Sequence, residues 1–265
     1  MPAKPRLGQN FLRDTEAIER IASSLGDLSN HTVVEIGPGH GAVTAAIVAR
    51  ASHVLAVELD PALAARLRTI FPIKSLTVIQ QNVLTFDFGA AAAKAGGPLL
   101  VFGNLPYYIT SQILLKLAAC HASIDQAALM VQREVADRVT AEPGSRNYGV
   151  LSVTVQLAGP ATTLFTLPPS AFTPPPDVHS TVFRWRIAPR FAELGIDESS
   201  FVALVRKVFA QKRKTLANNL RAAGYPARAI NIALYRAGID SSARAESLSI
   251  TSLAALWHAL KTPLS

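Results

Sequence analysis

The 265-residue sequence predicts an α/β fold: a Rossmann-like parallel sheet with helices on both faces, followed by a small all-helical C-terminal domain. Short apolar runs alternate with helical patterns from residue 32 onwards, and a glycine-rich turn joins the first run to the next helix. After Phe201 the apolar residues keep helical spacing. We therefore predict two domains, 1–190 and 191–265, with a linker-like segment around Pro189 and Gly195.

The composition is that of a globular protein, because 49% of the residues are hydrophobic and 17% are charged. No apolar run reaches the roughly 18 residues of a membrane helix. The basic N-terminus lacks the apolar segment of a secretory signal, so we expect a cytoplasmic protein. The single cysteine, Cys120, excludes a disulfide within one chain, and the six histidines lack metal-ligand spacing, so we expect no metal site.

The charge is unevenly distributed along the chain. Residues 1–200 contain 16 Lys and Arg against 16 Asp and Glu, whereas residues 201–265 contain 10 against 2. The net charge of +8 therefore lies in the last quarter of the chain. A neutral body with a basic end predicts an anionic partner, either nucleic acid or a membrane surface.

The individual elements follow from apolar periodicity and turn residues. Strands are predicted at 32–36, 53–57, 76–80, 99–102, 127–132, 162–167 and 180–187. Helices are predicted from an N-cap at Thr15 and over 42–50, 61–71, 110–119, 201–214 and 252–260. Loops are predicted at the Ala- and Gly-rich residues 90–97 and at 140–149, where a flexible loop could contact a substrate.

A glycine turn, Gly37-Pro38-Gly39-His40-Gly41, follows the first strand directly, and Glu58 ends the second strand about 20 residues later. An acidic residue at this spacing is placed to bind ribose hydroxyls. The spacing is G-x-G-x-G, not the dinucleotide fingerprint G-x-G-x-x-G, so we expect a compact nucleoside. Glu35, just before the turn, is placed to attract a cationic or ammonium-bearing ligand. The alternative is a glycine turn in an unrelated α/β protein.

Polar residues also follow the third and fourth strands, where Asn82 and Asn104 lie. Because the carboxyl ends of parallel strands meet at one edge of a sheet, these residues are expected to converge with Gly37 and Glu58. Asn82 would then contact the base of the bound nucleoside.

The stretch Asn104-Leu105-Pro106-Tyr107 suits a planar ring that carries an amine. The Asn104 side chain and the Leu105 carbonyl can each accept a hydrogen bond from such an amine. Pro106 fixes the backbone so that this carbonyl has one direction, and Tyr107 supplies a stacking face. The alternative is an ordinary strand-to-helix turn with a buried Tyr.

Phe172 precedes the proline run Pro174-Pro175-Pro176, which would hold its ring on a stiff segment. It is a candidate for a second stacking face opposite Tyr107. A Phe packed beneath a loop explains the pattern equally well.

Lys212, Arg213 and Lys214 form the densest basic run, and Arg221 follows on the next segment. Such runs are often solvated helix faces. The neutral body favours a phosphate-binding role, and membrane binding is disfavoured because no helix combines a wide apolar face with a basic one.

Several motifs in order resemble those of the small-subunit ribosomal RNA adenine N6-dimethyltransferases, which use S-adenosylmethionine. The resemblance covers nearly the whole chain. It is carried by Gly8-Gln9-Asn10-Phe11-Leu12, Glu35 through Gly41, Glu58, Asn104 to Tyr107, Tyr148-Gly149, Phe172-Thr173-Pro174, and Phe209 through Leu216.

The resemblance implies roles for residues at matching positions. Asn10 and Leu12 would cover the cofactor, Gly37 and Gly39 would admit its methionine part, and Glu58 would bind its ribose. Asn104 would face both the cofactor and the target base.

Two positions depart from the family pattern. The family usually has Asp where this chain has Asn82, so the bond accepted from the cofactor adenine would lack charge assistance. Tyr108 stands where Asn is common, and its role is undefined.

The implied activity is dimethylation of the N6 amine of two adjacent adenosines in a hairpin near the 3′ end of small-subunit ribosomal RNA, with a role in small-subunit assembly. Residues 1–190 would bind S-adenosylmethionine and residues 191–265 would bind RNA. The expected partner is a precursor of the small ribosomal subunit, with no membrane partner, and the expected state is a monomer. The alternatives are a large-subunit methyltransferase that confers antibiotic resistance and a non-catalytic RNA-binding assembly factor of the same fold.

Overall fold

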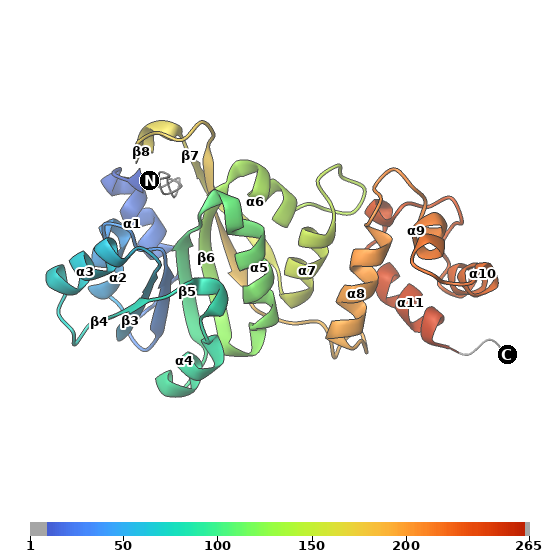
Figure 1. Ribbon diagram of the computed structural model, residues 1–265, viewed down its shortest axis with the longest axis horizontal. Helices are drawn as coiled ribbons and strands as arrows, with labels where there is room; N and C mark the ends of the chain where they lie inside the picture. The colour runs from blue at the N-terminus through green and yellow to red at the C-terminus, as the bar shows by residue number, and fades with distance from the viewer. Residues whose placement is uncertain (1–9, 263–265) are drawn as a thin grey trace, which may run out of the picture. The chain divides into compact units, whose positions relative to one another are not determined.

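The computed structural model describes residues 10–262, which form two compact units (Figure 1). The first unit contains the residues up to Ala136 together with Pro160–Ala188, and the second contains Asp137–Gly159 together with the residues from Pro189 onwards. The sequence places residues 137–159 in the first domain, whereas they pack with the second unit. The reason is a long-range contact, since Tyr148, Val153 and Leu157 belong to the same buried cluster as the C-terminal helices.

A seven-stranded sheet forms the centre of the first unit, in the order β4-β3-β2-β5-β6-β9-β7 (Figure 1). The strands from β2 to β6 pair in parallel, and β9 and β7 extend the sheet antiparallel. The strand bounds are β2 Thr32–Ile36, β3 His53–Glu58, β4 Leu76–Gln80, β5 Leu99–Asn104, β6 Ile124–Gln132, β7 Ala161–Leu167 and β9 Ser180–Arg186. Each predicted strand is thus confirmed, and so is the Rossmann-like class with its helical C-terminal region.

Two of the helices that connect these strands, α1 and α3, begin at side-chain caps. Asp14 caps α1 by accepting a hydrogen bond from the Ala17 N–H, so the N-cap lies one residue before the predicted Thr15. Asp60 caps α3, in which Pro61 occupies the first turn. The bounds are α1 Thr15–Ser23, α2 Ala42–Val48, α3 Pro61–Ile70, α5 Thr110–Ala119 and α6 Arg133–Val139.

The predicted loop at residues 90–97 is wrong, because a helix, α4 (Phe88–Ala95), occupies most of it. Asp87 caps this helix through the Ala90 N–H, and Gly96 ends it with a left-handed φ of 77°. Alanine has the highest intrinsic helix propensity, so an Ala-rich stretch between an Asp and a Gly is a helix signal.

A separate two-stranded sheet ties the N-terminal segment to a distant loop. Strand β1 (Phe11–Leu12) pairs antiparallel with β8 (Phe172–Thr173). The Arg13 N–H also donates to the Ala171 carbonyl. The Phe-Leu pair therefore docks onto the body of the first unit, and Leu12 is buried there.

The second unit is built from helices around one apolar cluster that includes Phe201, Leu204 and Trp257. Its helices are α7 Val150–Ala158, α8 Glu198–Val208, α9 Leu216–Ala222, α10 Ala227–Arg236 and α11 Ile250–Lys261. The predicted continuation of α8 through Lys214 is wrong, because the helix ends at Val208 and the basic run lies in the turn before α9. Tyr148, in the predicted flexible loop, is fully buried in the cluster.

No helix among residues 10–262 combines the length and the apolar character needed to cross a membrane.

We predict that Gly41→Ala lowers the free energy of unfolding by about 1–3 kcal/mol. Gly41 has a φ of 85°, and a Cβ there would lie 2.9 Å from the Phe71 ring and 3.0 Å from Leu67. Gly97→Ala is the matched control, since no atom lies within 4 Å of its added Cβ. Urea denaturation measures both variants. An equal loss of stability in the two would contradict this account of the turn.

Candidate active site

Four parallel strands end at one pocket of the first unit. It is lined by residues at or just past the ends of β2, β3, β4 and β5, among them Gly37, Glu58, Asn82 and Asn104. The parallel registers bring these ends together, because Ile36 pairs with both Val57 and Gly103. The predicted convergence of the strand ends is confirmed.

The glycine turn after β2 forms one wall of this pocket. Gly37 and Gly39 have left-handed φ values of 66° and 59°. A Cβ on Gly39 would lie 3.0 Å from the Phe11 ring. The Gly39 N–H donates to Glu58 Oε2 at 3.1 Å, which ties the turn to the end of β3. Glycine is therefore needed here for both conformation and space.

Glu58 is buried, and both of its carboxylate oxygens accept backbone hydrogen bonds. Oε2 accepts from Gly39 and Oε1 accepts from the Asp60 N–H at 2.9 Å. A carboxylate has about four lone-pair sites, so it can accept further bonds from ligand hydroxyls. The side chain is fixed in position before any ligand arrives.

Asn82 lies two residues past the end of β4, where it caps the short 3₁₀ helix η1 (Val83–Thr85). Its Oδ1 accepts from the Leu84 N–H at 3.0 Å. One acceptor position of the amide is therefore used within the chain, and its contact with a ligand base stays a prediction.

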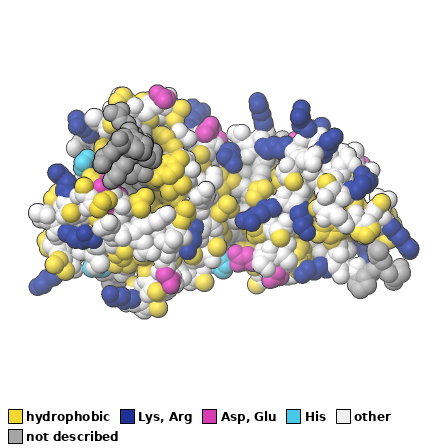
Figure 2. Space-filling view, viewed as in Figure 1, with side chains coloured by type: hydrophobic (Ala, Val, Ile, Leu, Met, Phe, Trp, Pro, Cys, Tyr) yellow, Lys and Arg dark blue, Asp and Glu magenta, His cyan; other side chains and the backbone are white. Residues whose placement is uncertain are grey.

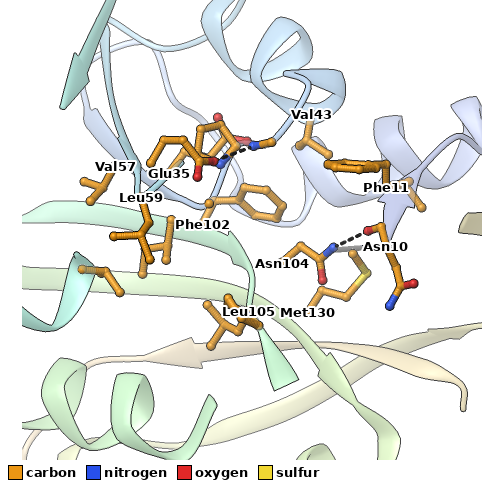
Figure 3. Close-up of a pocket in the computed structure, with 18 of the residues that line it drawn as sticks. Asn10, Phe11, Glu35, Val43, Val57, Leu59, Phe102, Asn104, Leu105 and Met130 are labelled. Atoms are coloured by element: carbon orange, nitrogen blue, oxygen red, sulfur yellow. Dashed lines mark hydrogen bonds between the residues drawn. The ribbon is translucent and has the colours of Figure 1, made fainter. Parts of the chain in front are cut away.

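Asn104 is the last residue of β5, and its side-chain amide points into the pocket toward the N-terminal segment (Figure 3). Nδ2 donates to the Asn10 carbonyl at 3.3 Å. This contact occupies the donor end of the amide, so the acceptor Oδ1 stays available to a ligand amine. Sequence reasoning missed the contact, which joins residues far apart in the chain.

The turn after Asn104 is held by several hydrogen bonds. The Leu105 N–H donates to the Met130 carbonyl at 2.9 Å, and the Thr110 hydroxyl donates to the Pro106 carbonyl at 2.8 Å. Tyr107 is half-buried in η2 (Tyr107–Ile109), with its hydroxyl 3.5 Å from Ser180 Oγ. Tyr108 is 59% exposed and also lines the pocket.

The N-terminal segment closes one side of the pocket. Asn10, Phe11 and Leu12 all line it, and the Phe11 ring lies 4.1 Å from the His40 ring. The positions predicted for Asn10 and Leu12 are therefore at the pocket. The motif residues Gly8 and Gln9 lie outside the described residues.

Phe172 does not form a wall of the pocket. Its side chain is 3% exposed and belongs to the apolar cluster with Leu12 and Ala171. Pairing with β1 holds this residue beneath the N-terminal segment. The structure thus favours the alternative, a Phe packed under a loop, over a ring open to a base.

The family model described as "Ribosomal RNA adenine dimethylase" matches residues 2–261 of the chain. A relative from Acidobacterium capsulatum, named ribosomal RNA small subunit methyltransferase A, is 54% identical over 259 residues, with 97% of this chain and 91% of the relative covered. A relative of the same name from Koribacter versatilis is 44% identical, with 97% and 94% covered. The chain belongs to the ribosomal RNA adenine dimethylase family.

Two solved structures have the same architecture as this dimethylase. A dimethyladenosine transferase from Plasmodium falciparum has a TM-score of 0.77 at 22% identity, with 93% of this chain and 95% of that chain covered, which supports the fold. The 23S rRNA methyltransferase ErmE has a TM-score of 0.70 at 26% identity, with 96% and 100% covered.

The dimethylase is an S-adenosylmethionine-dependent enzyme, and its pocket fits that cofactor. The absence of a Cβ at Gly39 lets the Phe11 ring pack against the glycine turn at the edge of the pocket, and the fixed Glu58 carboxylate suits ribose hydroxyls. Glu35 also lines the pocket, and its buried Oε2 has no hydrogen-bond partner among the described residues. Among residues 10–262, no three His, Cys, Asp or Glu side chains cluster as metal ligands do.

Glu35 lies on β2, is fully buried, and lines the pocket (Figure 3). Burial raises the pKa of its carboxyl from the ordinary 4.5 to about 7; the Thr44 hydroxyl lowers it in part, and the charge of Glu58 raises it further. The carboxyl is therefore largely protonated in the free protein below neutral pH.

We predict that the free energy of unfolding of the wild-type dimethylase falls as the pH rises from about 5 to about 8, and that Glu35→Gln lacks this fall. Because the pKa of Glu35 is raised on folding to about 7, the folded state binds this proton more tightly than the unfolded state. The stabilisation is complete below the unfolded pKa and disappears as pH rises through the folded pKa. Urea midpoints across this range measure it, and parallel curves for the two proteins would contradict the prediction.

Proposed function

We propose that this dimethylase modifies the N6 amines of two adjacent adenosines in a hairpin near the 3′ end of small-subunit ribosomal RNA, and that it takes part in small-subunit assembly. Relatives named ribosomal RNA small subunit methyltransferase A, at 54% and 44% identity over nearly the whole chain, support the choice of subunit. The substrate would be a precursor of the small ribosomal subunit. We further propose that the enzyme acts in the cytoplasm as a monomer.

The observation that carries the proposal is the orientation of the Asn104 amide. An exocyclic amine on a purine is a poor nucleophile because its lone pair is delocalised into the ring. With Nδ2 bound to the Asn10 carbonyl, Oδ1 of Asn104 accepts one N–H of the amine, and the Leu105 carbonyl accepts the other. These bonds favour the pyramidal nitrogen of the transition state. The cofactor supplies an electrophilic methyl group on a sulfonium.

Positioning, and not a strong general base, would carry the reaction. Pro106 has a φ of −60°, and its carbonyl is fixed by Thr110, so the turn does not need to reorganise. The target base must leave its stack, which costs a few kcal/mol in a duplex and less in a loop. Stacking on Tyr107, at about 1–3 kcal/mol per base, would offset this cost. Phe172 would supply the opposite face only after leaving its buried position.

The cofactor contacts follow the same edge of the sheet. Asn10 and Leu12 would cover the ligand, Gly37 and Gly39 would admit its methionine part, and Glu58 would bind its ribose. Asn82 would accept a hydrogen bond from the adenine amine with its remaining acceptor position, without charge assistance.

RNA binding is proposed for the second unit, where Lys212, Arg213, Lys214 and Arg221 are all exposed. Figure 2 displays many Lys and Arg side chains on the drawn face of this unit. The basic turn is held from below by the buried Asn219, whose amide accepts from the Gln211 N–H and donates to the Gln211 carbonyl, both at 3.1 Å. An exposed cationic turn suits a phosphate backbone.

Two other functions fit the observations less well. A large-subunit methyltransferase is represented by ErmE, which is 26% identical to this chain, well below the 54% of the small-subunit relative. A non-catalytic assembly factor would not need the oriented Asn104 amide or the fixed Glu58 carboxylate.

We predict that Asn104→Ala reduces methyl transfer by at least about 100-fold while the dissociation constant for S-adenosylmethionine changes by less than about tenfold. Asn104→Asp is the informative companion, because its carboxylate keeps an acceptor but loses the donor to the Asn10 carbonyl. Transfer of labelled methyl groups to unmodified small subunits gives the rate, and calorimetry gives the affinity. Full turnover by the Ala variant would rule out the proposed role.

Replacing Lys212, Arg213 and Lys214 together by Gln is expected to weaken RNA binding and to lower the slope of log affinity against log salt by about 2–3. Arg66→Gln, Arg68→Gln and Lys74→Gln together are the matched control in the first unit. An unchanged salt slope for the first triple variant would mean that the basic turn is only solvated surface.

A further inference from the structure

Tyr108 lines the pocket of the dimethylase, although it is 59% exposed. Leu105, three residues earlier on the same turn, is only 1% exposed, and Tyr107 is half-buried. Exposure thus rises along the turn from the interior of the pocket towards solvent. Tyr108 therefore lies at the mouth of the pocket, where a nucleotide chain whose base has entered must continue.

The backbone on both sides of Tyr108 is held in place. The Pro106 carbonyl accepts hydrogen bonds from the Ile109 N–H at 3.2 Å and from the Thr110 hydroxyl at 2.8 Å. These two bonds close the 3₁₀ helix η2 and join it to α5. A tyrosine side chain has only two torsions to order, so a ring on a fixed backbone stacks on a planar ligand at low entropic cost.

Tyr107 and Tyr108 are not placed to sandwich one base. Successive side chains of a 3₁₀ helix point about 120° apart, because the helix has three residues per turn. The Tyr107 hydroxyl lies 3.5 Å from Ser180 Oγ, which directs that ring towards the start of β9, whereas Tyr108 is open to solvent. The two rings therefore face different nucleotides.

A base that leaves its stack exposes one face of the next base in the RNA. The mouth of the pocket can receive that base, since residues 104–119 contain no acidic side chain that would repel its phosphates. We propose that Tyr108 forms a second nucleotide subsite, in which its ring stacks on the base next to the adenosine held for methylation. This inference rests on the proposed function, because it requires an RNA substrate with a nucleotide beside the target.

A stacking subsite suits two adjacent adenosines that are methylated in turn. The neighbouring base is adenine in one round and N6,N6-dimethyladenine in the other, which has lost both N–H groups of its amine. A side chain that accepts a hydrogen bond from that amine would bind only the unmodified form. An aromatic ring contacts the π-face of the base, so Tyr108 accepts the neighbour before and after its modification.

Initial rates of methyl transfer to unmodified small subunits test this subsite in the full-length enzyme. Tyr108→Ala is expected to lower kcat/KM for small subunits by about 5–150-fold, mainly through a higher KM, because one base stack is lost. Tyr108→Phe keeps the ring and is expected to stay within about threefold of the wild type. Ile73→Ala is the control, since Ile73 is 85% exposed and precedes β4, at the end of that strand opposite to the pocket. Calorimetry is expected to give the same dissociation constant for S-adenosylmethionine in all of these proteins.

Small subunits whose RNA carries uridine in place of one of the two adenosines show which base Tyr108 contacts. Uracil offers a smaller face than adenine, so the wild type is expected to lose at least about threefold in kcat/KM for the remaining adenosine. The same replacement is expected to cost Tyr108→Ala less, because the stack is already absent. Such coupling is expected for at least one of the two replacements.

The possible results separate the subsite from the proposed function. Equal kcat/KM for Tyr108→Ala and the wild type, or an equal loss in Tyr108→Phe, would overturn the subsite. Weaker cofactor binding that accounts for the whole loss, or an absence of coupling for both RNA replacements, would overturn it as well. A wild-type enzyme that does not methylate small subunits would instead contradict the proposed function, and the subsite with it.

Discussion

Parallel pairing of β2 with β3 on one side and with β5 on the other is the constraint on which the whole pocket depends. It brings the glycine turn, the Glu58 carboxylate and the Asn104 amide to the same edge of the sheet. The hydrogen bond from the Gly39 N–H to Glu58 then locks two of these ends together. A one-residue slip in either pairing would turn these side chains to the opposite face.

The N-terminal segment forms a further side of the pocket that the strand ends create. Pairing of β1 with β8 holds the Asn10 carbonyl at the Asn104 amide, which decides which end of that amide accepts from a ligand. The same segment places the Phe11 ring against Gly39 and His40. The orientation of the Asn104 amide therefore depends on contacts between chain segments that are far apart in sequence. Glu35 adds an electrostatic constraint, because burial raises the pKa of its carboxyl to about 7.

The strands of the first unit and the polar residues at their ends could be predicted from the sequence, because both follow local patterns. Glu58, Asn82 and Asn104 were identifiable as strand-end polar residues, and parallel topology then forces their convergence. Local sequence patterns gave wrong predictions for segments whose structure is determined by tertiary packing. The basic run does not continue α8, because hydrogen bonds from Asn219 hold the preceding Gln211 in a turn. Phe172 is buried in the apolar core, where its strand pairs with β1. Residues 137–159 join the second unit through the burial of Tyr148, which no local periodicity reveals. The helix at 88–95 is different, because local signals do predict it. Its Asp87 and Gly96 caps and its alanines are typical of a helix, but the Ala- and Gly-rich composition was interpreted as a loop.

The role we propose for the oriented Asn104 amide is to present adenosines of small-subunit RNA for dimethylation. The most direct measurement incubates the protein with methyl-labelled S-adenosylmethionine and unmodified small or large ribosomal subunits, and then maps the modified nucleotides by mass spectrometry. We expect N6,N6-dimethyladenosine at two adjacent positions in one hairpin near the 3′ end of the small-subunit RNA. Modification of large-subunit RNA alone, or of neither RNA, would contradict it.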